Sequence, residues 1–120
     1  MNFSKVLLPL GILLLFLVGC NNETSNPTPK EYLNYDNADI FLLNGYVFSN
    51  AHDVEWVTEL KYEFGEQIGE ITKQADKASK FENGTANKLP IGTKIFETDT
   101  PAFIAIVNGE EIPYLKMIEG

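Results

Sequence analysis

The sequence predicts a mostly β domain, a small antiparallel sheet or partly closed barrel, preceded by an N-terminal signal helix and a flexible tether. Two observations predict this class. Short apolar runs rich in strand-forming residues recur from residue 40 to the C-terminus, and Gly, Pro, Asn and Asp separate them. One polar stretch leaves room for a short helix, which would make the domain α+β.

Residues 1–20 are ordered like a secretory signal. A short segment with one positive charge precedes an almost wholly apolar run, which ends in Gly19 and Cys20. The alternative is a membrane-spanning helix. The 14 residues from Val6 to Gly19 would extend only ~21 Å as a helix, short of a ~30 Å hydrocarbon core. A cleaved signal peptide over residues 1–19 is therefore predicted.

Leu17-Val18-Gly19-Cys20 resembles the lipobox of bacterial lipoprotein precursors. The resemblance implies cleavage between Gly19 and Cys20, and attachment of diacylglycerol to the Cys20 thiol, with palmitate among its acyl chains. It leaves open whether the new amino terminus is also acylated. It places the protein at the cell membrane, lipid-anchored on the extracytoplasmic face. A buried or redox role for this cysteine is the alternative, but a polar segment follows it, with no core to enter.

Residues 20–37 are expected to form the lipidated, flexible tether, and residues 38–120 the globular domain. The tether contains two prolines, and residues 21–30 have no large apolar side chain, so it cannot bury enough surface to fold. Tyr32, Leu33 and Tyr35 are the first residues that could dock back onto the domain.

The first two segments of the domain carry different patterns. Residues 40–48 are apolar at both odd and even positions, which predicts one strand buried on both faces. Residues 54–64 alternate between apolar and charged side chains, which favours a half-exposed strand. A short helix over residues 53–60, capped by Asp53, is the alternative, because it would also gather apolar side chains on one face.

The rest of the domain reads as strands joined by turns. A turn at Gly65 leads to a strand over residues 67–73, and a long polar connection with a turn at Asn83-Gly84 follows. Three short strands are then predicted over residues 92–98, 102–107 and 111–119. Asn108-Gly109 predicts a hairpin between the last two. Pro113 cannot donate to a ladder, so the last strand is expected at an edge or with its first half unpaired.

A second resemblance covers residues 81–97, FENGTANKLPIGTKIFE, together with the closing NGEEIPYLKMIEG. These segments resemble small lipoproteins of Bacillus-like bacteria, which combine a lipobox with a compact domain and have no settled activity. The resemblance implies class and location only.

Composition argues against nucleic acid as a partner. The formal net charge is −8, so phosphate backbones repel the chain, and all nine basic residues are lysines. Without arginine the chain lacks the preferred side chain for bidentate recognition of bases and phosphates.

No catalytic, metal or cofactor site is predicted. His52, the only histidine, stands near Asp53 and Glu55, but one histidine and two carboxylates define no metal geometry. Trp56 and the tyrosines are expected in core or edge packing rather than in a ligand platform. The acidic run is expected to line a solvated face; it comprises Glu55, Glu59, Glu63, Glu66 and Glu70.

The function expected from these features is a non-enzymatic binding or accessory module at the cell envelope. Its partner would be an envelope protein, a peptide or a wall component. The alternatives are a small envelope hydrolase that uses carboxylates, and a protein-inhibitor or immunity-type lipoprotein.

Replacing Cys20 with Ser tests the anchor directly. Oxygen cannot replace sulfur in the thioether linkage, so we expect radiolabelled palmitate to enter the wild-type protein and not C20S. Persistent labelling of C20S in intact cells would contradict the lipoprotein assignment.

Overall fold

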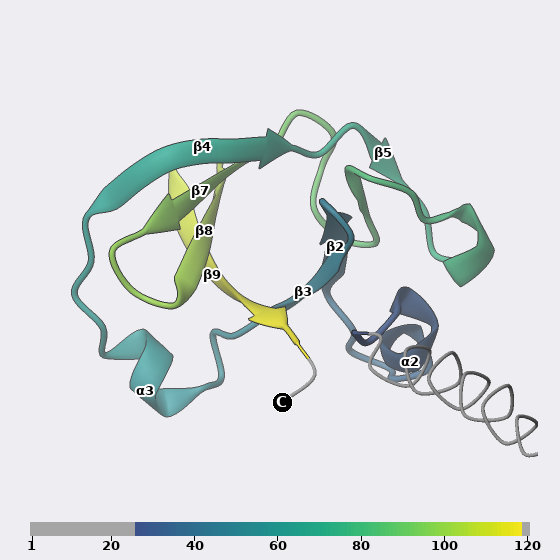
Figure 1. Cartoon of the computed structure of the whole chain (residues 1–120), viewed down its shortest axis with the longest axis horizontal. Helices are drawn as coiled ribbons and strands as arrows, with labels where there is room; N and C mark the ends of the chain where they lie inside the picture. Colours follow the sequence, from purple (N-terminus) through teal and green to yellow (C-terminus); the bar gives the residue numbers. More distant parts are fainter. Residues whose placement is uncertain (1–25, 119–120) are drawn as a thin grey trace, which may run out of the picture.

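A computed structural model describes residues 26–118, and within that range the fold is the predicted mostly β, partly closed barrel (Figure 1). Eight strands in this part of the chain form one sheet. The elements are α2 Pro29–Leu33, β2 Ile40–Leu43, β3 Tyr46–Asn50, α3 Glu55–Thr58, β4 Phe64–Glu70, β5 Lys73–Gln74, the 3₁₀ turn η1 Ala78–Lys80, β6 Thr85–Ala86, β7 Lys94–Thr98, β8 Ala102–Val107 and β9 Glu110–Met117.

The sheet curls because two consecutive strands of the chain, β4 and β5, form its two opposite ends. The strand order is β4-β7-β8-β9-β3-β2-β6-β5, so β4 and β5 lie at opposite ends although only Ile71 and Thr72 separate them in sequence (Figure 1). The Ile71 amide donates to the Thr93 carbonyl at 2.8 Å, and the Thr72 amide donates to the Gly84 carbonyl at 2.9 Å. Consecutive residues thus bond to the two ends of the sheet, which the chain bends to join.

A contact between Gly69 and the Leu43 side chain also holds the two halves of the curled sheet together. A Cβ built on Gly69 in β4 would lie 2.7 Å from Leu43 Cδ1, so the β4 backbone and the Leu43 side chain at the end of β2 touch directly. Only glycine allows this approach, and it brings two strands from opposite halves of the sheet into contact.

Residues 40–48 form a hairpin, so the prediction of a single strand there is wrong. Asn44 and Gly45 have φ values of 54° and 86°, as a two-residue type I′ loop requires. β2 and β3 pair antiparallel from Ile40↔Ser49 to Leu43↔Tyr46. Apolar residues occur at both parities because the two arms of the hairpin both contribute to the core.

A helix within residues 53–60 is confirmed, and the strand predicted over residues 54–64 is wrong. The cap expected from Asp53 is also wrong, because Val54 is the N-cap and no side chain caps the helix. α3 covers Glu55–Thr58, and Phe64 begins β4. Val57 is buried against Ala51 and Ala102. The alternation of apolar and charged residues predicted a buried face that does not exist. Trp56 and Phe64, two of its expected members, are 51% and 44% exposed.

The predicted strand over residues 67–73 is displaced toward the N-terminus. β4 runs through Gly65, so the turn expected there is wrong, and the chain bends at Ile71 instead. The polar connection contains the 3₁₀ turn η1, and the turn at Asn83-Gly84 is confirmed, with Gly84 at φ 91°.

The three C-terminal strands are confirmed, with bounds shifted by a few residues at β7 and β9. Asn108 and Gly109 form the predicted hairpin loop, at φ 52° and 83°. Of the two alternatives for the last strand, the edge position is wrong, because β9 lies between β8 and β3. Its first half does lack a partner on the β3 side, since residues 110–113 pair with β8 alone. Pro113 fits there because the β3 ladder starts only at Tyr114, while the Pro113 carbonyl accepts from the Ala51 amide at 2.9 Å. In an antiparallel strand the nitrogen and the carbonyl of a residue point to the same neighbouring strand. The Pro113 nitrogen, which carries no hydrogen, therefore points toward β3 at a position just outside the β3–β9 ladder.

A short helix lies within the segment expected to be a flexible tether. The Thr28 amide donates to Glu31 Oε2 at 2.8 Å, and Pro29 occupies the first helical position of α2. These signals are local, so the helix forms without contributing a buried residue, and it rests against β2 and η1. Ordered structure therefore begins before residue 38.

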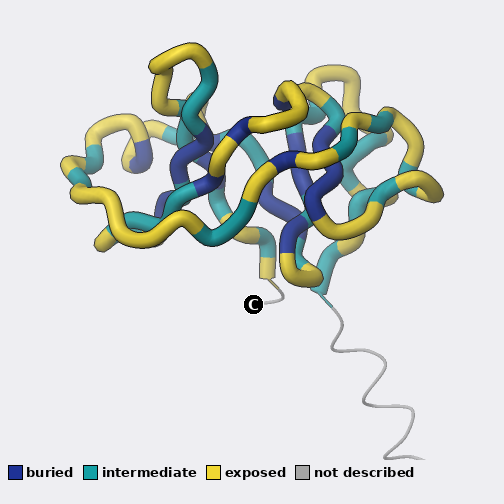
Figure 2. Tube along the Cα trace, turned by 90° about the horizontal axis from the view of Figure 1, so that it is seen from above, coloured by how far each residue is buried: buried dark blue, intermediate teal, exposed yellow. Residues whose placement is uncertain are grey.

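The core lies inside the curl, and Figure 2 shows the buried segments toward the centre of the domain with exposed loops around them. Phe41 stacks on Phe48 with ring centroids 4.6 Å apart, and the Tyr114 ring lies 5.0 Å from Phe41. Ile71 belongs to the same cluster and is fully buried.

Ile71→Ala and Ile91→Ala form a matched pair that tests the role of the bend. Ile71 is 0% exposed and Ile91 is 66% exposed. We expect I71A to lower the free energy of unfolding by about 2–5 kcal/mol, since it opens a cavity where the two ends of the sheet meet. I91A should change it by less than about 0.5 kcal/mol. Equal effects in urea denaturation would show that Ile71 has no special role.

Candidate functional site

A cavity of about 370 Å³ opens between the end of α2 and the base of the β2–β3 hairpin. This volume lies in the range of small-molecule sites. We call it the hairpin pocket; its lining residues are Tyr32, Tyr35, Asn37, Ala38, Asp39, Ile40, Ser49, Asn50, His52, Asp53 and Lys88.

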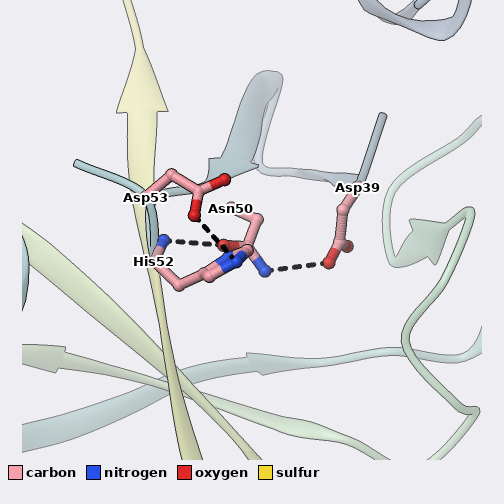
Figure 3. A network of polar contacts seen from close by, with 4 residues as sticks. All are labelled: Asp39, Asn50, His52 and Asp53. Atoms are coloured by element: carbon pink, nitrogen blue, oxygen red, sulfur yellow. Dashed lines mark hydrogen bonds and ion pairs between the residues drawn. The ribbon is translucent and has the colours of Figure 1, made fainter. Parts of the chain in front are cut away.

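Asp39 and Asn50 face each other at the base of the hairpin and form the centre of a polar network (Figure 3). The Asn50 side-chain amide donates to Asp39 Oδ2 at 2.9 Å, and the Asn50 backbone amide donates to the Asp39 carbonyl at 2.9 Å. These bonds extend the hairpin beyond its ladder and fix two polar side chains at the pocket wall.

His52 extends the network toward solvent (Figure 3). Asn50 Oδ1 accepts from the His52 backbone amide at 2.7 Å and lies 2.6 Å from His52 Nδ1. His52 Nε2 lies 3.1 Å from Asp53 Oδ1. Both ring nitrogens thus face oxygen acceptors, and the imidazolium form donates to both. The two side chains are 65% and 83% exposed, so the pair contributes little to stability.

Tyr114 anchors the network to the core. Its hydroxyl donates to Asp39 Oδ1 at 2.7 Å, while its ring is fully buried against Phe41. Burial raises the pKa of the Tyr114 hydroxyl well above its usual value, and the hydrogen bond to Asp39 adds to the shift. Tyr114 therefore remains a neutral donor across the physiological pH range.

Asn87 holds the same wall from the other side. Its side-chain oxygen accepts from the Ile40 amide, and its side-chain nitrogen donates to the Ala38 carbonyl, both at 2.8 Å. One amide side chain therefore fixes the backbone on either side of Asp39. The pocket wall is rigid before any ligand arrives, which lowers the entropic cost of binding.

The arrangement suits binding better than catalysis. Each oxygen of Asp39 already accepts a hydrogen bond, and Asp53 faces His52. Burial raises the pKa of the Tyr32 hydroxyl, and the negative charge of Glu31 adds to the shift, so this hydroxyl is a donor. Among residues 26–118 no group of three or more His, Cys, Asp or Glu side chains is placed to hold a metal ion.

The residues singled out from the sequence are dispersed. Gly19 and Cys20 lie outside the described residues. The glutamates of the acidic run are all exposed, as expected for a solvated face. Trp56 was expected in core or edge packing; at 51% exposed on α3, it does not belong to the core. Tyr114 does belong to the core, whereas Tyr32 and Tyr35 line the hairpin pocket.

Asp39 and Asn50 were missed, although the sequence contains a signal for them. They lie equally far from Asn44-Gly45, so a two-residue hairpin loop at that dipeptide places them opposite each other. Tyr114 could not be found in this way, because its contact with Asp39 depends on the pairing of β9 with β3.

A scan against protein-family models gives no match to this chain, and searches of curated proteins and of solved structures give none either. None of the helices within residues 26–118 has the length and apolar character needed to cross a bilayer.

Tyr114→Phe tests whether the core holds the pocket wall. Losing the bond to the Asp39 carboxylate should lower the free energy of unfolding by about 1.5–3 kcal/mol near neutral pH. Because the folded-state pKa of Tyr114 is raised, its contribution is complete below the unfolded-state pKa of 10.0 and declines as the pH rises above it. The difference between wild type and Y114F should therefore narrow above about pH 10.

Tyr46→Phe is the control, because no hydrogen bond of the Tyr46 hydroxyl occurs within the described chain and Tyr46 lies at the rim of the core. Denaturant titrations from neutral to alkaline pH measure both variants. A difference for Y114F that does not change with pH would contradict the role assigned to its hydroxyl.

Proposed function

We propose that the protein is a lipid-anchored lipoprotein that acts as a non-enzymatic binding or accessory module on the extracytoplasmic face of the cell membrane. Its partner is an envelope protein, a peptide or a wall component, bound at the hairpin pocket. The observation that carries the binding role is the preformed pocket wall, in which Asp39 is fixed by Tyr114 and Asn50. The lipobox residues supply the argument for the anchor.

The position of α2 supports a partner close to the membrane. Thr28 is the N-cap of α2, and Tyr32 within α2 lines the hairpin pocket. From Cys20 to Thr28 the chain advances eight residues, which can span at most about 29 Å. A lipid on Cys20 would therefore keep the pocket near the outer surface of the membrane, at the boundary with the wall.

The state of the pocket carboxylates argues against the hydrolase alternative. Hydrolysis by paired carboxylates needs one acid that delivers a proton and a second that acts as base or nucleophile. Asp39 instead accepts from Tyr114 and Asn50 and serves the structure of the wall. Asp53 is 83% exposed, so its surroundings provide none of the burial that tunes a catalytic acid.

Site-specific crosslinking in intact cells tests the binding role. A photoreactive benzoylphenylalanine is placed at Tyr35 in the pocket or, as the control, at Ile91, and both positions are 66% exposed. We expect a discrete crosslinked adduct from position 35 and none from position 91. C20S should lose that adduct, because the unanchored domain leaves the membrane surface.

Three outcomes would contradict the proposal. Equal adducts from both positions would indicate random collisions, and no adduct at position 35 would leave the pocket without a partner. Hydrolysis of wall material by the purified protein, abolished in Asp53→Asn, would establish the enzyme alternative. Adducts at position 35 are identified by mass spectrometry, and one stoichiometric protein partner whose activity is inhibited on binding would favour the inhibitor or immunity-type alternative.

A further inference from the structure

Two opposite charges in the hairpin pocket have no ionic partner. Among residues 26–118 no lysine or histidine forms an ion pair with Asp39, and no carboxylate pairs with Lys88. Asp53, the other carboxylate of the pocket, lies with its Oδ1 3.1 Å from His52 Nε2. The pocket therefore presents the Asp39 carboxylate and the Lys88 ammonium group, neither in an ion pair, to a ligand that enters it.

We propose that the hairpin pocket binds a small zwitterion, namely an amino acid or a short peptide with free amino and carboxyl groups. The ligand ammonium group lies against Asp39 and its carboxylate against Lys88. This inference rests on the proposed binding function and names the ligand class of the same site.

Asp39 keeps the capacity to bind an ammonium group. An ionised carboxylate has about four acceptor positions, and the bonds from Tyr114 and Asn50 use two of them. Both donors are neutral, so they position the carboxylate without cancelling its charge. An ammonium group supplies both the missing donors and the missing charge, in charge-assisted bonds that are stronger than neutral ones.

Lys88 provides an ammonium group on a backbone segment that hydrogen bonds hold in place. Gln74 Nε2 donates to the Lys88 carbonyl at 3.1 Å and to the Leu89 carbonyl at 3.0 Å, which holds the backbone of this loop. The Lys88 side chain itself is exposed. Its four-carbon stem lets the ammonium group adjust to the position of a ligand carboxylate.

Tyr32 and Tyr35 favour the same class of ligand. Both residues line the pocket. An aromatic face attracts an ammonium group by cation–π interaction and also covers the short apolar part of an amino acid. A purely anionic ligand would be repelled by Asp39 and Asp53, and a purely cationic one would leave Lys88 unmatched.

Four dipeptide probes test the contributions of the ligand ammonium group and the ligand carboxylate one at a time. Alanyl-alanine has both, its N-acetyl derivative lacks the ammonium group, its amide lacks the carboxylate, and the doubly capped form lacks both. Each is titrated into the isotope-labelled full-length protein in detergent, following the backbone amide resonances of Asp39, Asn50 and His52 by NMR. We expect alanyl-alanine to bind with a Kd of about 1 mM or below, and each singly capped probe to bind about tenfold or more weakly.

Lys88→Gln and the matched control Lys94→Gln assign the carboxylate contact. Both lysines are exposed, and Lys94 lies on β7, outside the pocket. K88Q should weaken alanyl-alanine about tenfold. It should leave binding of the amide unchanged, because that probe has no carboxylate to lose. K94Q should bind all four probes as the wild type does. The ammonium contact is tested through the probes alone, because replacing Asp39 would disturb the wall.

Equal binding of the four probes, or no binding of alanyl-alanine, would overturn the zwitterion proposal. So would an equal loss of affinity for alanyl-alanine and its amide in K88Q. These results are separable from failure of the proposed function. If the adduct at position 35 persists in cells while alanyl-alanine does not bind, the binding role stands and only the ligand class is wrong.

Discussion

The bend at Ile71 is the constraint on which the rest of the structure depends. One strand-like stretch pairs with β7 before the bend and with β6 after it, so the chain itself joins the two ends of the sheet. Ile71 fills the space inside the bend, and Gly69 lets Leu43 come against the backbone beside it. Most of the strands on either side are too short to bury a core by themselves, and curling them around one cluster solves that problem.

Fold and site share the same residues at the base of the β2–β3 hairpin. Tyr114 places its ring in the aromatic core and its hydroxyl on Asp39, so the pocket wall is held from inside the domain. Asn50 continues the hairpin beyond its ladder and also connects Asp39 to His52. A ligand would therefore meet an oriented carboxylate whose surroundings were ordered during folding, and little further ordering would be needed on binding.

Features that depend on the backbone preference of a few adjacent residues could be predicted from the sequence. Features that depend on the pairing of distant strands could not. The β class, the C-terminal hairpin and the Asn83-Gly84 turn followed from residue types that favour one backbone conformation. Asn44-Gly45 carried the same signal, but the apolar residues on both sides of it read as one strand, and the opposition of Asp39 and Asn50 was lost with it. The interior position of β9 and the bend at Ile71 depend on contacts between distant segments, which no local pattern contains.

The interior position of β9 also sets the order in which the sheet can be assembled. Without β9, β4, β7 and β8 have no hydrogen-bonded neighbour in common with β3, β2, β6 and β5. A nascent chain that lacks residues 110–117 therefore has the two parts of the sheet joined only through the bend at Ile71, and complete folding waits for nearly the whole described chain. For a protein exported as we propose, this delay keeps the polypeptide threadable through a translocation channel until β9 has been synthesised.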